Sequence, residues 1–208
     1  MLIGIIDYGC GNIHSIINAF SIYTDKVEIV KKPDQIKIYD KIVLPGVGSF
    51  PRGMKMLQEN KMIDSLNYFK ELERPILGIC LGMQLIFEKG FEFSETKGLG
   101  FLSGSVEKLQ SSKDCKLPNI GWNKIYNDKD DKFLNNKLLN GISSKNEFYF
   151  VHSYKCTCKD SEDVVAITNF CSNTFTSVVQ KNNIYGVQFH PEKSGKTGLK
   201  LISNFISL

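Results

Sequence analysis

The first half of this chain alternates short apolar runs with amphipathic segments, and this alternation constrains the fold more than any other feature. Four apolar runs have the length of buried strands, at residues 2–7, 27–30, 41–44 and 76–79. Apolar residues at helical spacing predict helices at residues 13–20, 62–69 and 81–88, with Asn12 as the N-cap of the first. Strands that alternate with helices predict a parallel sheet with crossover helices.

The second half is rich in β-forming residues. Strands are predicted at residues 105–109, 148–156, 164–168, 175–180 and 184–189. A turn at Asn182-Asn183 separates the last two, and a final helix is predicted over residues 199–206. The simplest architecture is one α/β domain over residues 1–208. It has a mostly parallel central sheet flanked by helices, with an antiparallel β annex.

Composition excludes several classes of function. Lys plus Arg is 26 and Asp plus Glu is 22, so the net charge is only +4. Only Arg52 and Arg74 are arginines and no basic block occurs, so nucleic acid is not an expected partner. No run approaches the roughly 20 apolar residues that span a membrane, and residues 1–6 have no basic flank of a signal peptide. We therefore expect a cytoplasmic protein in which all six cysteines are free thiols.

One cysteine has the setting of a nucleophile. In Gly78-Ile79-Cys80-Leu81-Gly82 a predicted strand ends, Cys80 follows, and a predicted helix begins. This arrangement is typical of a nucleophile elbow, in which the two glycines permit a tight turn. The helix N-terminus favours a thiolate, and the Leu81 N–H is placed to stabilise an oxyanion. A lone buried cysteine is commonly only a small apolar side chain, so Cys80 needs a base to support this interpretation.

His190-Pro191-Glu192 supplies a candidate base. Proline disfavours helix in the preceding residue, so His190 and Glu192 are predicted to project to one side of an extended segment. A carboxylate beside an imidazole fixes its tautomer, as in a catalytic triad. A surface histidine beside a solvated glutamate is the commoner fate of such a triplet, but together with Cys80 the triplet predicts a Cys–His–Glu triad.

Two further motifs, one of glycines and one of cysteines, carry weaker signals. Pro45-Gly46-Val47-Gly48 follows a predicted parallel strand and could aim an N–H of Val47 or Gly48 at the same sheet edge, although taken alone it is more often an ordinary strand-to-helix turn. Cys156-x-Cys158 has too few neighbouring ligands for zinc. We expect neither a metal nor a cofactor.

With these residues in view, the chain resembles class I glutamine amidotransferases, whose fold is flavodoxin-like. More narrowly it resembles the glutaminase subunits of imidazole glycerol phosphate synthase. The matching strings run from end to end and are Asp7-Tyr8-Gly9, Gly11-Asn12, Leu44 to Phe50, Gly78 to Gln84, Lys97 to Gly100, Gly121-Trp122-Asn123, Phe150 to Tyr154 and Gln188 to Gly195.

The resemblance implies a role for each matching position. Cys80 would be the nucleophile, His190 the general base and acid, and Glu192 its orienting carboxylate. The positions that would hold L-glutamine are Gln84, Glu92, His152 and Ser153. Those near a partner interface would be Asn12, Trp122, Asn123 and Tyr149.

The implied reaction is hydrolysis of glutamine, with ammonia passed to a (β/α)₈-barrel cyclase in a heterodimer that serves histidine biosynthesis. An alternative stays open, because paralogues of this subunit supply ammonia for amidation of bacterial surface sugars. The chain departs from the family at Phe93 and at Asn119, and histidine is common at the position of Asn119. These departures are the reason for retaining the alternative. Neither a standalone thiol hydrolase nor a non-catalytic binding subunit fits the triad and the subfamily strings as well.

Overall fold

The computed structural model describes residues 1–113, 115–127, 133 and 135–208. Its strands fall into two sheets, one large and one of two strands. Across the large sheet the strand order is β2-β1-β3-β4-β13-β12-β10-β7-β5-β6, and β11 pairs with β12. Within the described residues, no helix combines the length and the apolar character that crossing a membrane requires.

The parallel part of the large sheet contains the first four predicted strands and the last one. Its members are β1 (Ile3–Ile6), β2 (Val27–Val30), β3 (Lys41–Leu44), β4 (Ile76–Ile79) and β13 (Ile184–Val187). All four neighbouring pairs among them are parallel. Such strands read as continuous apolar runs because helices cover both faces of the sheet. The predicted strand–helix alternation is thus confirmed.

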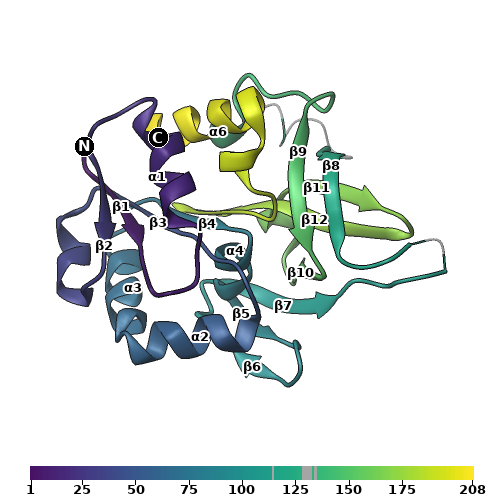
Figure 1. Ribbon diagram of the computed structural model, residues 1–208, viewed down its shortest axis with the longest axis horizontal. Coiled ribbons are helices and arrows are strands. Elements are labelled where there is room, and N and C mark those ends of the chain that lie inside the picture. The colour runs from purple at the N-terminus through teal and green to yellow at the C-terminus, as the bar shows by residue number, and fades with distance from the viewer. Residues whose placement is uncertain (114, 128–132, 134) are drawn as a thin grey trace.

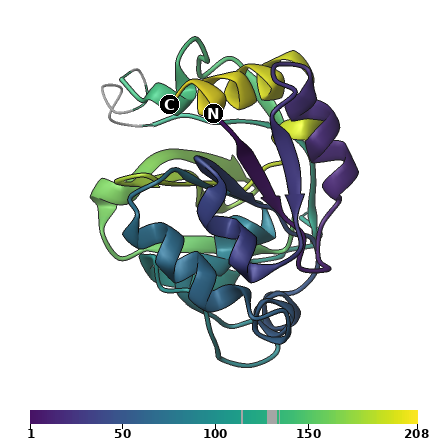
Figure 2. The ribbon, with the colours of Figure 1, turned by 90° about the vertical axis from the view of Figure 1, so that its left-hand side faces the viewer.

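Helices pack on both faces of this sheet, as Figures 1 and 2 show. The helices are α1 (Ile13–Ser21), α2 (Phe50–Glu59), α3 (Met62–Glu71), α4 (Leu81–Leu85) and α6 (Gly195–Ser207). Helices α1 and α6 contribute Phe20 and Phe205 to one core, together with Ile3 and Ile5 of β1. The second core, on the other face, includes Ile6 and residues of α2, α3 and α4.

Two predictions about helices need correction. The helix predicted over residues 81–88 ends at Leu85, because residues 87–90 form the strand β5. Asn12 occupies the N-cap position of α1, but its side chain makes no capping hydrogen bond. Helix α2 is an addition to the predicted elements, and its proline at the second position is compatible with the first turn of a helix.

The antiparallel annex extends the large sheet beyond β13 (Figure 1). Its strands are β5 (Phe87–Gly90), β6 (Thr96–Lys97), β7 (Leu102–Lys108), β10 (Tyr154–Cys158), β11 (Val164–Phe170) and β12 (Asn173–Lys181). Their pairs are antiparallel except that of β5 with β7, which is parallel. Strands β8 (Asn119–Lys124) and β9 (Glu147–His152) form the small sheet. The single strand predicted over residues 148–156 is wrong, because the chain passes from β9 to β10 at Ser153 and changes sheet.

The chain also contains four short 3₁₀ segments among its described residues. They are η1 (Pro33–Ile38), η2 (Lys137–Leu139), η3 (Ser161–Asp163) and η4 (Pro191–Lys193). The predicted turn between the last two strands is confirmed, with Asn182 in the left-handed conformation at φ 51°. Segment η4 lies between β13 and α6 and carries one of the predicted site residues.

The expectation that all six cysteines are free is wrong for two of them. Cys115 and Cys171 form a disulfide between positions 56 residues apart, with 6.1 Å between their Cα atoms. The other four cysteines are free thiols. The fold brings the segment before β8 against the turn between β11 and β12, a proximity that no local pattern reveals. Among the residues that the structure describes, no cluster of three or more His, Cys, Asp or Glu could hold a metal ion.

Candidate active site

Cys80 lies at the carboxyl end of β4, where the chain turns into α4. Its backbone is in the left-handed region, with φ 53°, and its side chain is buried. Two backbone hydrogen bonds hold this strained residue: the Cys80 N–H donates to the Val187 carbonyl at 2.8 Å, and the Gln84 N–H donates to the Cys80 carbonyl at 3.1 Å. Such strain is typical of a nucleophile elbow.

The two glycines around Cys80 act differently from the prediction. Cys80 itself, and neither glycine, takes the positive φ of the turn. A Cβ on Gly82 would lie 1.8 Å from the Leu44 carbonyl oxygen, and one on Gly78 would lie 2.8 Å from backbone atoms of Gly82. These glycines are therefore required because α4 packs directly against β3 and β4, which brings Cys80 to the sheet edge.

His190 reaches the same edge from β13, the parallel neighbour of β4. Its Nδ1 lies 2.8 Å from Oε1 of Glu192, and both side chains are almost fully buried. The predicted contact is therefore present, and His190 itself is extended as predicted, with φ −100° and ψ 96°. The extended segment does not continue to Glu192, because Pro191–Lys193 forms a 3₁₀ turn. Because a carboxylate accepts, Nδ1 carries the proton of this hydrogen bond. Among the described residues, Nε2 of His190 has no hydrogen-bond partner.

The electrostatic setting of His190 favours its charged form. Burial pulls the pKa of His190 down, but the Cys80 sulfur and the Glu192 carboxylate outweigh it and raise the pKa to about 10. A thiolate beside an imidazolium is the ion pair expected of an activated cysteine.

A cavity of about 320 Å³ opens beside Cys80. Its lining contains His190 and all seven predicted oxyanion and substrate positions, namely Val47, Gly48, Leu81, Gln84, Glu92, His152 and Ser153. Segments far apart in the sequence thus converge on one site, as the sheet-edge argument predicts.

Individual contacts within this cavity refine the predictions. The Val47 N–H donates to the Cys10 carbonyl at 3.3 Å, so this amide is engaged outside the cavity in the present conformation. Oε2 of Glu92 accepts from the Phe50 N–H at 2.7 Å. Burial raises the pKa of Glu92, and this hydrogen bond opposes the rise. Glu92 therefore presents a partly buried carboxyl group to the cavity.

Sequence reasoning missed Gln188, which is fully buried beside the cysteine. Its Nε2 lies 3.8 Å from Sγ of Cys80, and its Oε1 accepts from Nε2 of Gln84 at 3.1 Å. Gln84 also donates to the Tyr154 carbonyl at 3.2 Å. Gln188 lies two residues before His190, so the period-two pattern of a strand could have placed both on one side.

The four predicted interface residues lie in two places. Trp122, Asn123 and Tyr149 belong to the β8–β9 sheet, where Trp122 and Tyr149 are direct partners with ring centroids 6.0 Å apart. Trp122 is 53% exposed, which is unusual for a tryptophan. Asn12 is exposed at the start of α1.

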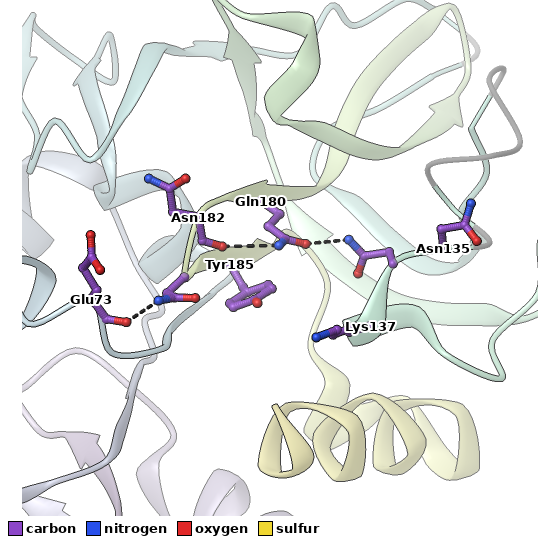
Figure 3. A pocket seen from close by; sticks show the side chains of 8 residues that line it. Glu73, Asn135, Lys137, Gln180, Asn182 and Tyr185 are labelled. Carbon is purple, nitrogen blue, oxygen red and sulfur yellow. Dashed lines mark hydrogen bonds between the residues drawn. The ribbon is translucent and has the colours of Figure 1, made fainter.

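A second cavity, of about 870 Å³, lies near the amino ends of β4 and β13 (Figure 3). Three of its amide side chains are hydrogen-bonded within the wall: Asn136 donates to Gln180 at 2.6 Å, Gln180 to the Asn182 carbonyl, and Asn183 to the Glu73 carbonyl. None of the predicted site residues lines it. Its size alone therefore does not make it the active site.

Comparison with known proteins identifies the family. The family description "Glutamine amidotransferase class-I" matches residues 4–208. The imidazole glycerol phosphate synthase subunit HisH of Sulfurimonas denitrificans is 42% identical over 98% of this chain and 97% of its own length. The HisH subunit of Pelagibacter ubique is 44% identical over the full length of both chains, and HisH 2 of Methanococcus maripaludis is 45% identical over 99% of this chain and 98% of its own.

Solved structures agree on the fold. A crystal structure described as a glutamine amidotransferase superposes with a TM-score of 0.75 at 16% identity, covering 100% of this chain and 98% of the other. A putative GMP synthase subunit from Thermoplasma acidophilum superposes with a TM-score of 0.71 at 22% identity, covering 100% and 93%. The chain therefore belongs to the class-I glutamine amidotransferases, and within them to the HisH subunits of imidazole glycerol phosphate synthase.

Proposed function

We propose that this chain hydrolyses L-glutamine to glutamate and ammonia through a triad of Cys80, His190 and Glu192. The observation that carries the proposal is that His190 lines the same cavity as the strained Cys80, with its Nδ1 2.8 Å from Oε1 of the buried Glu192. We further propose that residues 1–208 form one domain, which carries this site.

The reaction would run in two steps. The Cys80 thiolate attacks the side-chain amide carbon of glutamine, and the imidazolium of His190 gives its proton to the departing ammonia. The resulting γ-glutamyl thioester is then attacked by water, from which His190 takes a proton, and the thiol leaves as glutamate forms. Glu192 holds Nδ1–H of His190 in place, so that Nε2 faces the reacting atoms.

Backbone amides would stabilise the oxyanion of each tetrahedral intermediate. Leu81 is the first residue of α4 and supplies one N–H directly after the nucleophile. The second would come from Val47 or Gly48, which line the opposite wall of the cavity. Val47 would have to release the Cys10 carbonyl before it could serve.

The remaining cavity residues suit the zwitterionic end of glutamine. The carboxylate of Glu92 matches the α-ammonium group, and backbone N–H groups near Ser153 match the α-carboxylate. Gln84 and His152 complete the wall. No step of this chemistry requires a metal or a cofactor.

Free ammonia would be protonated and lost as a nucleophile in water, so a synthase should receive it. We propose a (β/α)₈-barrel cyclase as the partner in a heterodimer, docked over Trp122, Asn123, Tyr149 and Asn12. The relatives named above are described as imidazole glycerol phosphate synthase subunits. This supports ammonia supply for histidine biosynthesis and does not favour the surface-sugar alternative.

Replacement of the nucleophile tests the proposal. Cys80→Ala should abolish glutamine hydrolysis by the purified complex while the complex still forms on gel filtration. Cys158→Ala, which removes another free thiol in β10, is the matched control and should retain activity. Undiminished turnover of Cys80→Ala would exclude the assigned nucleophile. Growth of a strain that lacks its own HisH, when it carries this chain and its partner, would separate the histidine pathway from sugar amidation.

A further inference from the structure

A second buried histidine, His152, lines the same cavity as His190. It lies at the end of β9 and is only 6% exposed. Its Nδ1 is 2.8 Å from the Tyr154 carbonyl oxygen. A carbonyl can only accept a hydrogen bond, so Nδ1 carries a proton. In a neutral ring Nε2 then has a lone pair and needs a donor.

Asn119 supplies that donor. Asn119 lies directly opposite His152 in the β8–β9 register and is almost fully buried, and its Nδ2 is 3.0 Å from Nε2 of His152. The rest of the Asn119 amide fits this orientation, since its Oδ1 accepts from Nδ2 of Asn123 at 3.2 Å. Both ring nitrogens of His152 are therefore occupied, and in the neutral ring each of the two hydrogen bonds has one direction.

The surroundings keep His152 neutral. Burial lowers the pKa of His152 to about 4; the hydrogen bond to the Tyr154 carbonyl opposes this, and the charge of His190 adds to it. Aromatic rings pack around it, with the Phe175 and Phe150 centroids at 4.9 and 5.8 Å. Two histidines beside one cysteine thus differ: His190 is poised to be charged, and His152 is held uncharged.

We propose that Asn119 is a positioning residue, which occupies the lone pair of His152 and so leaves Nε2 of His190 as the ring nitrogen available for proton transfer. Among the described residues, Nε2 of His190 is a buried ring nitrogen without a hydrogen-bond partner, in contrast to both nitrogens of His152. This inference rests on the proposed glutaminase function and adds to it a reason why only one of two adjacent imidazoles acts.

Asn119 also orders the wall around the nucleophile. The Tyr154 carbonyl that accepts from His152 accepts from Gln84 as well. Gln84 in turn contacts Gln188, whose amide faces Sγ of Cys80. A change in the His152 tautomer would remove one of the two hydrogen bonds that hold this carbonyl. The effect should reach the glutamine pocket, although Asn119 itself is not among the residues that line the cavity.

The tautomer of His152 can be read directly by NMR. The chain has three histidines, so a ¹⁵N-histidine-labelled full-length sample gives three ring systems, which single substitution of His14 helps to assign. We expect His152 to be the neutral Nδ1–H tautomer between about pH 5.5 and 8. An Nε2–H tautomer, or a titration of His152 near its ordinary pKa of about 6.5, would overturn the proposal. The tautomer itself is read on the wild-type protein and needs no turnover.

A variant then tests the consequence for catalysis. Asn119→Asp replaces the donor by an acceptor of the same shape, so Nε2 of His152 should acquire a proton and its pKa should rise. We expect kcat/KM for glutamine to fall roughly tenfold or more, with a new dependence on pH that follows the titration of His152. A folded Asn119→Asp with kcat/KM within about twofold of wild type would refute the positioning role.

Asn169→Asp is the matched control. Oδ1 of the exposed Asn169 accepts from the Thr174 hydroxyl at 2.7 Å, which a carboxylate can do equally well, so activity should not change. If Asn119→Asp does not fold, the tautomer of His152 in the wild type still tests the proposal. Failure of the glutaminase proposal would appear separately, as turnover that survives Cys80→Ala.

Discussion

Removal of the charge on Glu192 gives a sharp test of the triad. Glu192→Gln keeps the shape of a side chain that is almost completely buried, and it removes the negative charge 2.8 Å from Nδ1 of His190. The substitution is therefore expected to act on the protonation of His190 and to leave the fold intact. The imidazolium that should protonate ammonia would lose its counter-charge.

The magnitude follows from the structure. The pKa of His190 stands at about 10 instead of 6.5, a difference that corresponds to about 5 kcal/mol in favour of the charged form. Two charges 2.8 Å apart attract by about 6 kcal/mol at an effective dielectric constant of about 20. The Cys80 sulfur contributes more to the rise than Glu192 does, so it still favours the charged ring when Glu192 is lost. We therefore expect the pKa of His190 to fall in Glu192→Gln but to stay above its value in a variant that lacks both partners.

Glutamate release by the complex, followed across pH, is the assay. Glu192→Gln should lower kcat by about 10³- to 10⁴-fold, as loss of the orienting carboxylate does in other triads. Glu71→Gln, on the exposed surface of α3, should have no effect. Wild-type activity in Glu192→Gln, or a His190 ring that still titrates near pH 10 by NMR, would refute the reasoning.

The same substitution has a predicted signature in stability. A histidine whose pKa is raised on folding stabilises the folded state fully below its unfolded pKa, and this contribution disappears as the pH rises through the folded pKa. The wild type should therefore exceed Glu192→Gln in free energy of unfolding at pH 6.5, and the difference should shrink toward pH 10. Urea denaturation at several pH values measures it.

Two further predictions concern the scaffold. The Cys115–Cys171 disulfide closes a loop of 56 residues, so Cys115→Ser should lower the free energy of unfolding by at most about 4 kcal/mol. A thiol titration of the unfolded, unreduced wild type should find four reactive groups, and six would contradict the disulfide. Gly82→Ala would place a Cβ 1.8 Å from the Leu44 carbonyl oxygen, so we expect a loss of about 3 kcal/mol or more and weakened glutaminase activity. Gly11→Ala, whose Cβ would meet only side-chain atoms at 3.2 Å or more, is the control, and equal melting temperatures of the two variants would contradict the packing argument.

The parallel half of the fold was predictable because its signals are local. The first four strands keep close to their predicted bounds, and three of them, β1, β3 and β4, are fully buried. A strand covered on both faces reads as a nearly continuous apolar run. The strands of the antiparallel annex were harder to predict. The apolar run 148–156 contains the point at which the chain leaves β9 for β10, and only pairing with distant strands determines that break. Strand β8 is not predicted either, because it carries few apolar residues and only its pairing with β9 defines it as a strand.

The same difference between local and long-range signals applies to the candidate site. Cys80, His190 and Glu192 could be named because their neighbours in the sequence have recognisable geometry. The contact of Gln188 with Cys80 and the hydrogen bond of the Val47 amide to the Cys10 carbonyl could not be predicted, because each joins residues far apart in the chain. The disulfide is a further case, since cysteine spacing carries no information about a pairing across 56 residues.

The two sheets position different residues of the site. The parallel sheet brings Cys80 and His190 to one edge, because β4 and β13 are neighbours and run in the same direction. The small β8–β9 sheet brings His152 to the other side of the cavity and presents Trp122 to solvent. A partner docked on Trp122 would therefore contact the strand that carries Asn119, whose amide holds the second imidazole neutral. A displacement of β8 would act directly on the hydrogen bond between Asn119 and His152, and only indirectly on the triad.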